Sequence, residues 1–169
     1  MTRPLPASLL RERRAIRTLS GPGLIRLVTE IDDNGPIGRG SLQGAFGDLT
    51  PGQLRHALDT ARDLDLIHAA ESADNRYRLT GSGEDLAEVY DTAARWARSH
   101  QYPSSTSDFV TRVQHTLQLH SRGPQQNSAT AERPAPHHVL AEWLQANPRA
   151  LNHANTPSCL AAQESGRAA

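Results

Sequence analysis

The sequence contains no lysine, a single cysteine and few aromatic residues. Its 18 basic residues are all arginine, and 18 acidic residues balance them, so the formal net charge is zero. The lone cysteine, Cys159, cannot form an intramolecular disulfide, which excludes a disulfide-stabilised fold and fits a reducing cytosol. Aromatic residues make up 4% of the chain and the mean hydropathy is −0.58. Part of the chain is therefore expected to lie outside a packed core.

Long apolar runs and catalytic motifs are also missing. No stretch approaches the length of a membrane span, and no signal-peptide core follows the N-terminal arginines, so we expect a cytoplasmic protein with no membrane partner. The sequence has no phosphate-binding loop, no dinucleotide fingerprint and no nucleophile elbow. We therefore expect no enzyme activity, no catalytic residues and no cofactor.

The histidines do not have the spacing of a metal site. His115 and His120 are five positions apart, whereas ligands on one helical face are three or four apart. The adjacent His137 and His138 face apart. No metal site is predicted.

The most informative stretch is residues 41–79, which predicts a short helix, a turn, a second helix and two strands. The second helix, residues 51–64, has the clearest start signal. Thr50 can cap it, Pro51 suits the first helical position, and Gln53 can complete a capping box. One face of this helix is apolar, through Leu54, Leu58 and Ala61.

The predicted strands form a wing over residues 68–79. Asp74 and Asn75 favour a turn, and residues 76–79 alternate polar and apolar side chains as a half-buried strand does. Thr80 then caps a long helix over residues 81–99. This order is typical of a winged helix-turn-helix, a module that usually places its second helix in the DNA major groove.

The runs LTPGQLRHALDTARDLDLI and RYRLTGSGEDLAEVYDTAARWA resemble HxlR-type transcriptional regulators, relatives of the MarR group. The resemblance covers residues 20–100 and extends to small regulatory proteins of high-GC actinobacteria. It implies a sequence-specific DNA-binding regulator that acts as a homodimer on double-stranded DNA, with room for an unknown small-molecule effector. HxlR proteins commonly carry an N-terminal cysteine. This chain has none there, so the resemblance does not extend to thiol sensing.

The exposed face of the second helix and the wing provide the candidate DNA contacts. Arg55 has the geometry to bind guanine and Gln53 to pair adenine, whereas Arg76 suits the backbone or minor groove. The predicted DNA-binding residues are Thr50, Gly52, Gln53, Arg55, His56, Asp59, Arg62, Arg76 and Arg78.

The fold class expected is mostly α with a small β-wing, flanked by dimerisation helices and a loose C-terminal tail. Residues 1–20 form a basic arm and helix, either packed on the core or facing phosphate in a dimer. Residues 21–100 form the winged domain, and residues 101–122 add a helix. The apolar stripes of helices 81–99 and 108–119 favour a dimer interface, and the alternative is that both helices fold back on their own domain. The predicted interface comprises Leu86, Val89, Tyr90, Ala93, Trp96, Phe109, Val113 and Leu117.

Residues 123–169 are predicted to be a flexible linker, a short amphipathic helix and a tail. Residues 121–136 have little apolar content, and Val139, Leu140, Trp143 and Leu144 favour a short helix. The sequence leaves open whether that helix docks. Residues 147–169 are expected to be disordered, so deletion of 123–169 is expected to leave the domain folded.

Charge argues against a simple DNA-binding surface. Residues 21–100 hold eight arginines and 13 acidic residues, and residues 1–20 hold five arginines and one acid. Because DNA affinity depends on phosphate neutralisation, the interface has to be assembled from few residues. The candidates are Arg39, Arg55, Arg62, Arg76, Arg78 and the N-terminal arginines. The alternative function is a winged-helix protein-interaction module that no longer binds DNA.

Overall fold

A computed structural model describes residues 6–69, 75–121 and 135–153. The first arm residues, the tip of the predicted wing, the predicted linker and the end of the tail with Cys159 lie outside the described residues. Expectations that fall on those segments are therefore not addressed by the structure.

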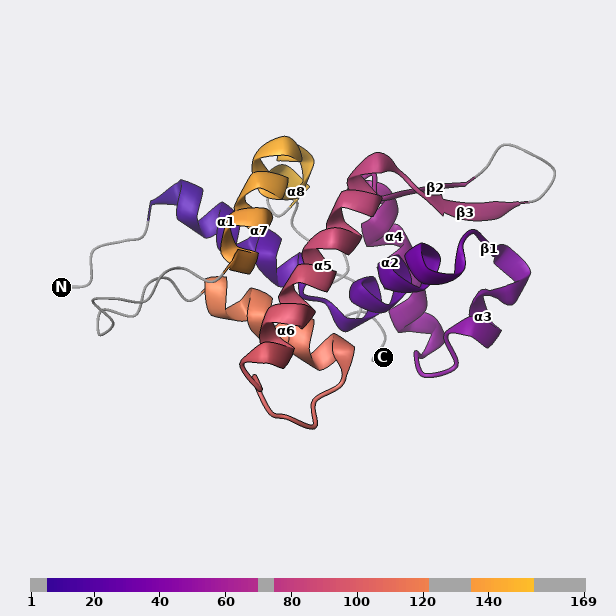
Figure 1. Cartoon of the computed structure of the whole chain (residues 1–169). Coiled ribbons are helices and arrows are strands. Elements are labelled where there is room, and N and C mark those ends of the chain that lie inside the picture. Colours follow the sequence, from indigo (N-terminus) through magenta and orange to yellow (C-terminus); the bar gives the residue numbers. More distant parts are fainter. Residues whose placement is uncertain (1–5, 70–74, 122–134, 154–169) are drawn as a thin grey trace, which may run out of the picture.

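The chain is mostly helical, with one small three-stranded antiparallel sheet (Figure 1). The elements are α1 (Ala7–Leu19), α2 (Pro22–Asn34), β1 (Ile37–Gly38), the 3-10 turn η1 (Arg39–Ser41), α3 (Leu42–Ala45), α4 (Pro51–Asp63), β2 (Ile67–Ala69), β3 (Arg76–Leu79), α5 (Gly81–Ser99), α6 (Phe109–Ser121), α7 (Ala135–Ala146) and α8 (Pro148–His153). The strand order is β1-β3-β2, so β3 is the central strand and pairs with both neighbours.

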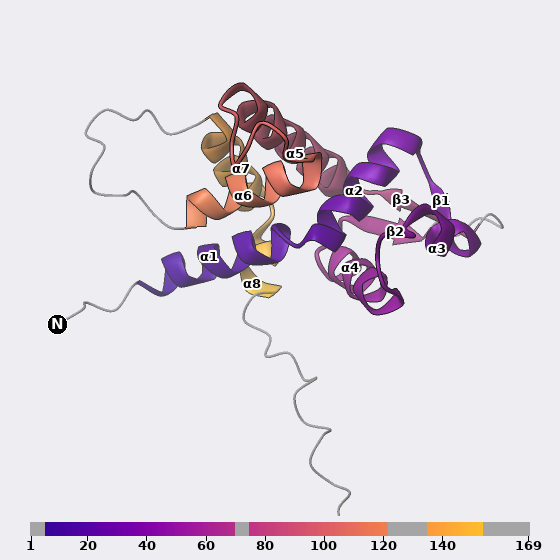
Figure 2. The same cartoon turned by 90° about the horizontal axis from the view of Figure 1, so that it is seen from below.

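Two regions share one continuous core. The sheet region, α2 to β3, carries the hairpin that projects at one end of the molecule, and the helical region, α1 with α5 to α8, occupies the other end (Figure 1). Helix α2 joins them because it packs against α4 on one side and against α5 on the other (Figure 2).

The two predicted helix starts are confirmed. The Thr50 hydroxyl accepts a bond from the Gln53 backbone N–H at 3.2 Å, and the Gln53 side-chain oxygen accepts one from the Thr50 N–H at 2.9 Å. The Thr80 hydroxyl caps α5 by accepting from the Gly83 N–H and also donates to the Asp65 carbonyl. A Cβ at Gly83 would lie 2.1 Å from the Leu66 carbonyl oxygen, so the start of α5 sits directly on the turn that follows α4.

The predicted dimer interface is wrong for most of its residues, because they form the core of their own chain. Helices α6 and α7 pack against α5 and against each other, and α1 packs against α6 and α8. The buried members of the predicted set are Leu86, Val89, Tyr90, Ala93, Val113 and Leu117, whereas Trp96 and Phe109 are half-buried. The Tyr90 hydroxyl donates to the Leu19 carbonyl at 2.7 Å, and burial raises the pKa of that hydroxyl. The fold-back alternative is therefore the observed one.

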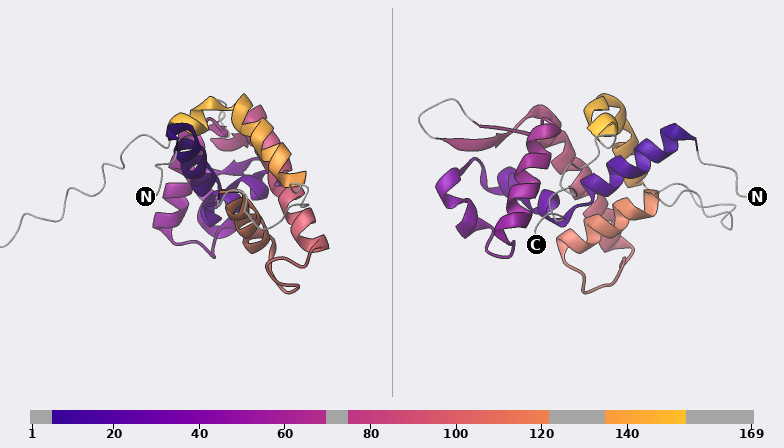
Figure 3. Two further views of the ribbon diagram at one scale, coloured as in Figure 1. Left: turned by 90° about the vertical axis from the view of Figure 1, so that its left-hand side faces the viewer. Right: turned by 180° about the vertical axis from the view of Figure 1, so that it is seen from behind.

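The predicted short C-terminal helix docks on the domain. In α7, Leu140, Trp143 and Leu144 are buried, and the Trp143 indole N–H donates to the Ser82 carbonyl at 3.1 Å. Helix α7 runs along α5 (Figure 3). Residues 148–153, expected to be disordered, form α8, which packs against α1. Because residues 123–169 contribute these buried side chains, we now expect their deletion to lower the stability of the domain.

Candidate nucleic-acid interface

Helix α4 has one buried and one exposed face. Leu54, Ala57, Thr60 and Ala61 are buried against the rest of the sheet region, and Leu58 is half-buried, less than the sequence pattern indicates. The exposed positions are Gly52, Gln53, Arg55, His56, Asp59 and Arg62, and Thr50 just before the helix is also exposed. The structure thus presents the polar residues predicted for α4 on one surface.

Two of these residues support the helix itself. The capping box engages the Thr50 hydroxyl and the Gln53 side-chain oxygen with each other's backbone. Pairing with adenine requires that same amide oxygen to accept a bond from the base. Gln53 is therefore held back against the helix start rather than extended towards a ligand.

Arg55 and His56 are different, because nothing in the described part of the chain engages them. Both are exposed, and no described residue makes a hydrogen bond or ion pair with the Arg55 guanidinium or the His56 ring. These two adjacent side chains on α4 remain available for a partner.

Each acidic residue on α4 and its following turn has a basic neighbour. Asp59 lies 3.5 Å from Arg62, Asp63 lies 3.3 Å from the His153 ring, and Asp65 lies 3.4 Å from Arg149. The last two partners come from α8, which the sequence interpretation had assigned to a disordered tail. An Asn before Pro148 is a helix-start signal that could have revealed this element.

Many of the other acidic residues gather on α2 and α5. Burial and the charges of Asp33, Asp91 and Glu84 raise the pKa of Asp32, which shows that these carboxylates lie close enough to repel one another. Helix α5 lies across α2 from α4 (Figure 2). Among the described residues, α2 and α5 therefore carry more acidic side chains than α4 and the turn that follows it.

The hairpin divides the predicted wing residues between its two faces. In the antiparallel register His68 is opposite Arg78 and Gly38 is opposite Arg76, and these residues share the outer, exposed face. Tyr77 alternates with the two arginines and points to the inner face. Arg76 and Arg78 therefore lie on the sheet face that is turned away from Tyr77.

Tyr77 joins the inner face of the hairpin to α4. Its side chain is 3% exposed, and its hydroxyl accepts a hydrogen bond from the Arg62 guanidinium. The guanidinium carbons of Arg62 and Arg39 lie 5.1 Å and 5.4 Å from the Tyr77 ring centre. Tyr77 was not among the predicted site residues, because an alternating strand pattern marks it only as a core residue.

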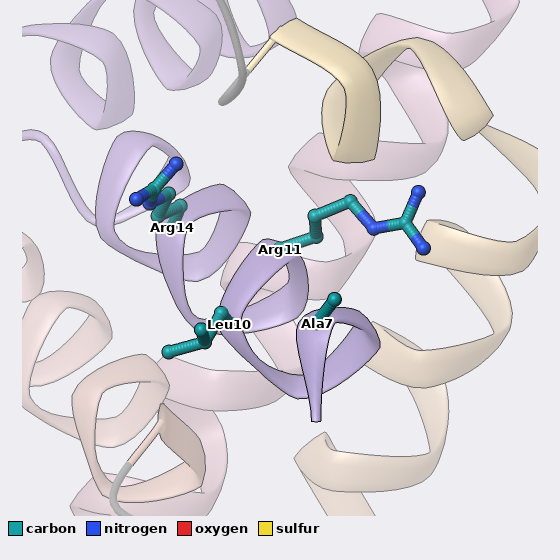
Figure 4. Close-up of a pocket in the computed structure, with 4 residues that line it drawn as sticks. All are labelled: Ala7, Leu10, Arg11 and Arg14. Atoms are coloured by element: carbon teal, nitrogen blue, oxygen red, sulfur yellow. The ribbon is translucent and has the colours of Figure 1, made fainter. Parts of the chain in front are cut away.

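The basic helix α1 presents a second exposed surface. Leu10 is 42% exposed, and Arg11, Arg14 and Arg17 are exposed beside it. Figure 4 shows Arg11 and Arg14 extending in different directions on either side of Leu10, around a hollow of about 350 Å³. Packing on the core, one of the two roles expected for this helix, is observed for Ala15, Ile16 and Leu19. Contact of its arginines with phosphate stays a prediction.

A larger hollow, of about 560 Å³, lies between α2, the turn before α4 and the start of α6. Most of its charged groups already have partners. Asp48 accepts two hydrogen bonds from Arg26, which lowers the pKa of that carboxyl, and Asp108 accepts a bond from the Thr111 N–H at the start of α6. This hollow links the two regions without presenting a set of free donors.

Among the described residues, no three His, Cys, Asp or Glu side chains converge into a group that could hold a metal ion. Within the same part of the chain, no helix combines the length and apolar character needed to cross a membrane. Comparison of the chain with protein-family models, with curated proteins and with solved structures gives no match.

Proposed function

We propose that residues 22–79 form a winged helix-turn-helix that binds double-stranded DNA, and that the protein is a transcriptional regulator. The order of elements supports this proposal: α2, β1, α3, α4 and then a hairpin whose second strand is central in the sheet. In such modules the second helix of the pair, here α4, enters the major groove and the hairpin lies beside it on the backbone or minor groove.

One observation carries the proposal. On the exposed face of α4, Arg55 and His56 are unengaged by any described residue, while Asp59, Asp63 and Asp65 each have a basic neighbour. A free guanidinium on such a helix suits bidentate bonding to guanine O6 and N7. Pairing of the carboxylates reduces their repulsion of phosphate, which an acidic domain has to limit in order to bind DNA.

The proposal includes a homodimer, because a single chain offers few basic groups to a duplex. The buried α5 stripe is not available for it. Among the apolar side chains left partly exposed are Leu10 on α1, Trp96 on α5 and Phe109 on α6. A dimer formed there would double the α4 surface and the arginines of α1.

The second candidate is a protein-interaction module of the same shape. The acidic cluster around Asp32 on α2 and α5 favours it, since such a surface repels DNA and attracts a basic partner. The two candidates differ in which surface is used: α4 in the first, α2 and α5 in the second.

Selection from a library of random duplexes with the purified full chain at low salt tests the proposal. We expect one enriched sequence, arranged as two half-sites about one helical turn apart if the protein is a dimer. A library that returns no enriched sequence, together with no binding to any duplex, would overturn the proposal in favour of the protein-interaction module.

A further inference from the structure

We propose that Arg39 and Arg62, gathered around Tyr77, form a phosphodiester-binding site between the hairpin and α4. This inference rests on the proposed DNA-binding function and selects two of the candidate arginines as the backbone contact. It predicts that the DNA backbone is held by the exposed Arg39 and Arg62 beside the buried Tyr77 rather than by Arg78 on the outer face.

Three elements bring the site together. Arg39 begins the turn after β1, Tyr77 lies in the central strand β3, and Arg62 comes from the last turn of α4. The two guanidinium carbons lie 5.4 Å and 5.1 Å from one ring centre, so the two positive charges flank the same side chain. Arg39 is also fixed through its backbone, whose N–H donates to the Asn75 carbonyl at 3.2 Å.

The charges of the site are largely uncompensated. No carboxylate of the described residues lies within ion-pair distance of Arg39, which is exposed. Arg62 has one carboxylate nearby, that of Asp59 at 3.5 Å, and both side chains are about half exposed. Such a pair of cations, one free and one weakly paired, attracts an anion.

The chemistry of the two side chains favours phosphate. A guanidinium is planar and presents several N–H donors in a fixed fork, which matches the oxygens of a phosphate group. Both guanidinium groups lie over the Tyr77 ring, and the Tyr77 hydroxyl accepts a hydrogen bond from Arg62. These contacts limit the conformations of both arginine side chains before a ligand binds. Tyr77 is thus a positioning residue, and the two arginines are the binding residues.

The position relative to α4 favours a nucleic-acid phosphate over a small anion. Arg62 and Arg55 belong to the same helix, two turns apart, and both are exposed. A duplex whose groove edge meets Arg55 therefore has its backbone close to Arg62. By contrast, Arg78 lies across the sheet from Tyr77, on the outer face with His68.

The salt dependence of binding to a duplex of unrelated sequence tests the site. Each phosphate contact contributes a slope of about 0.9 in the logarithm of affinity against the logarithm of salt. For Arg39→Ala we expect the slope to fall by about one contact, so that the affinity ratio of wild type to variant falls about three- to fourfold when salt is raised fourfold. Arg62→Ala is expected to behave similarly.

Arg78→Ala tests the competing assignment, because Arg78 is a DNA contact predicted from the sequence and carries the same charge on the opposite face of the same hairpin. If Arg39 and Arg62 hold the backbone, the slope of Arg78→Ala stays that of the wild type. Arg98→Ala, which removes an exposed arginine from α5, is the matched control. Tyr77→Phe keeps the ring and removes the hydroxyl bond to Arg62, so it should lower affinity while leaving the slope unchanged. Thermal unfolding of each variant establishes that the fold is retained. If Arg62→Ala is unstable, the salt slope of Arg39→Ala alone tests the site.

The outcomes separate this inference from the proposed function. A reduced slope for Arg39→Ala and an unchanged slope for Arg78→Ala support the site. If Arg78→Ala reduces the slope and Arg39→Ala does not, DNA binding stands and the site is wrong. If the wild-type chain binds no duplex at low salt, the proposed function fails and the inference fails with it.

Discussion

The sheet region and the helical region of this protein differ in which face of their amphipathic helices matters most for the fold or for a partner. Helix α4 in the sheet region keeps its polar face uncovered, with Arg55 and His56 exposed. Helix α5 in the helical region has its apolar stripe packed against α2, α6 and α7 of the same chain. An apolar stripe on one helix therefore shows that something covers it, but the identity of the cover depends on helices that come later in the sequence.

The two regions also differ in the surroundings of their acidic side chains. Where α5 meets the end of α2, burial and the neighbouring acidic side chains raise the pKa of Asp32. Around the end of α4 each acidic side chain has a basic neighbour, two of them supplied by α8. The C-terminal helices thus complete both regions: α7 completes the core of one, and α8 supplies the basic neighbours of the other.

The largest expected effect is a loss of stability caused by a substitution in the helical region. Trp143→Ala removes a side chain that is 4% exposed and its hydrogen bond to the Ser82 carbonyl. We expect a loss of about 3–5 kcal/mol in the free energy of unfolding, the usual cost of a buried Trp→Ala change. Urea denaturation measures it.

Gln145→Ala is the control for that variant, because Gln145 is exposed on the same helix. Its denaturation midpoint should match that of the wild type. Equal midpoints for all three proteins would mean that α7 does not dock and that the helical region ends with α6.

A smaller effect tests whether Gln53 of α4 supports the start of the helix or contacts DNA. Gln53→Ala removes the bond that its side-chain oxygen accepts from the Thr50 N–H. We expect a loss of about 0.5–1 kcal/mol of stability, the net contribution of an exposed hydrogen bond at a helix start, measured by thermal unfolding. The preferred DNA sequence should stay the same. A changed base preference without a stability loss would show instead that Gln53 contacts DNA.

Local chemistry made much of the sheet region predictable. The capping box at Thr50, the cap at Thr80 and the alternation in residues 76–79 depend on neighbours within a few positions, and the sequence displays those neighbours directly. The exposed face of α4 followed from the same periodicity.

What could not be predicted depends on long-range packing. The alternation of β3 separates Tyr77 from Arg76 and Arg78 but does not say which face α4 lies on, and that requires the contact between Arg62 and Tyr77. The stripe of α5 favoured a dimer and was also compatible with folding back on its own domain, and the packing of Leu140, Trp143 and Leu144 in the same chain shows the second arrangement. The neighbours of Asp63 and Asp65 are more than 80 positions away in the sequence.

The central claim is that the exposed face of α4 reads DNA, and Arg55→Ala tests it most directly. The measurement is the affinity of wild type and variant for the selected duplex and for versions changed at single base pairs, with Arg98→Ala, exposed on α5, as the control. We predict an unchanged melting temperature, a loss of about 1–3 kcal/mol in specific binding and a relaxed preference at one base pair. An Arg55→Ala variant that binds the selected duplex as tightly and as selectively as the wild type would contradict the account.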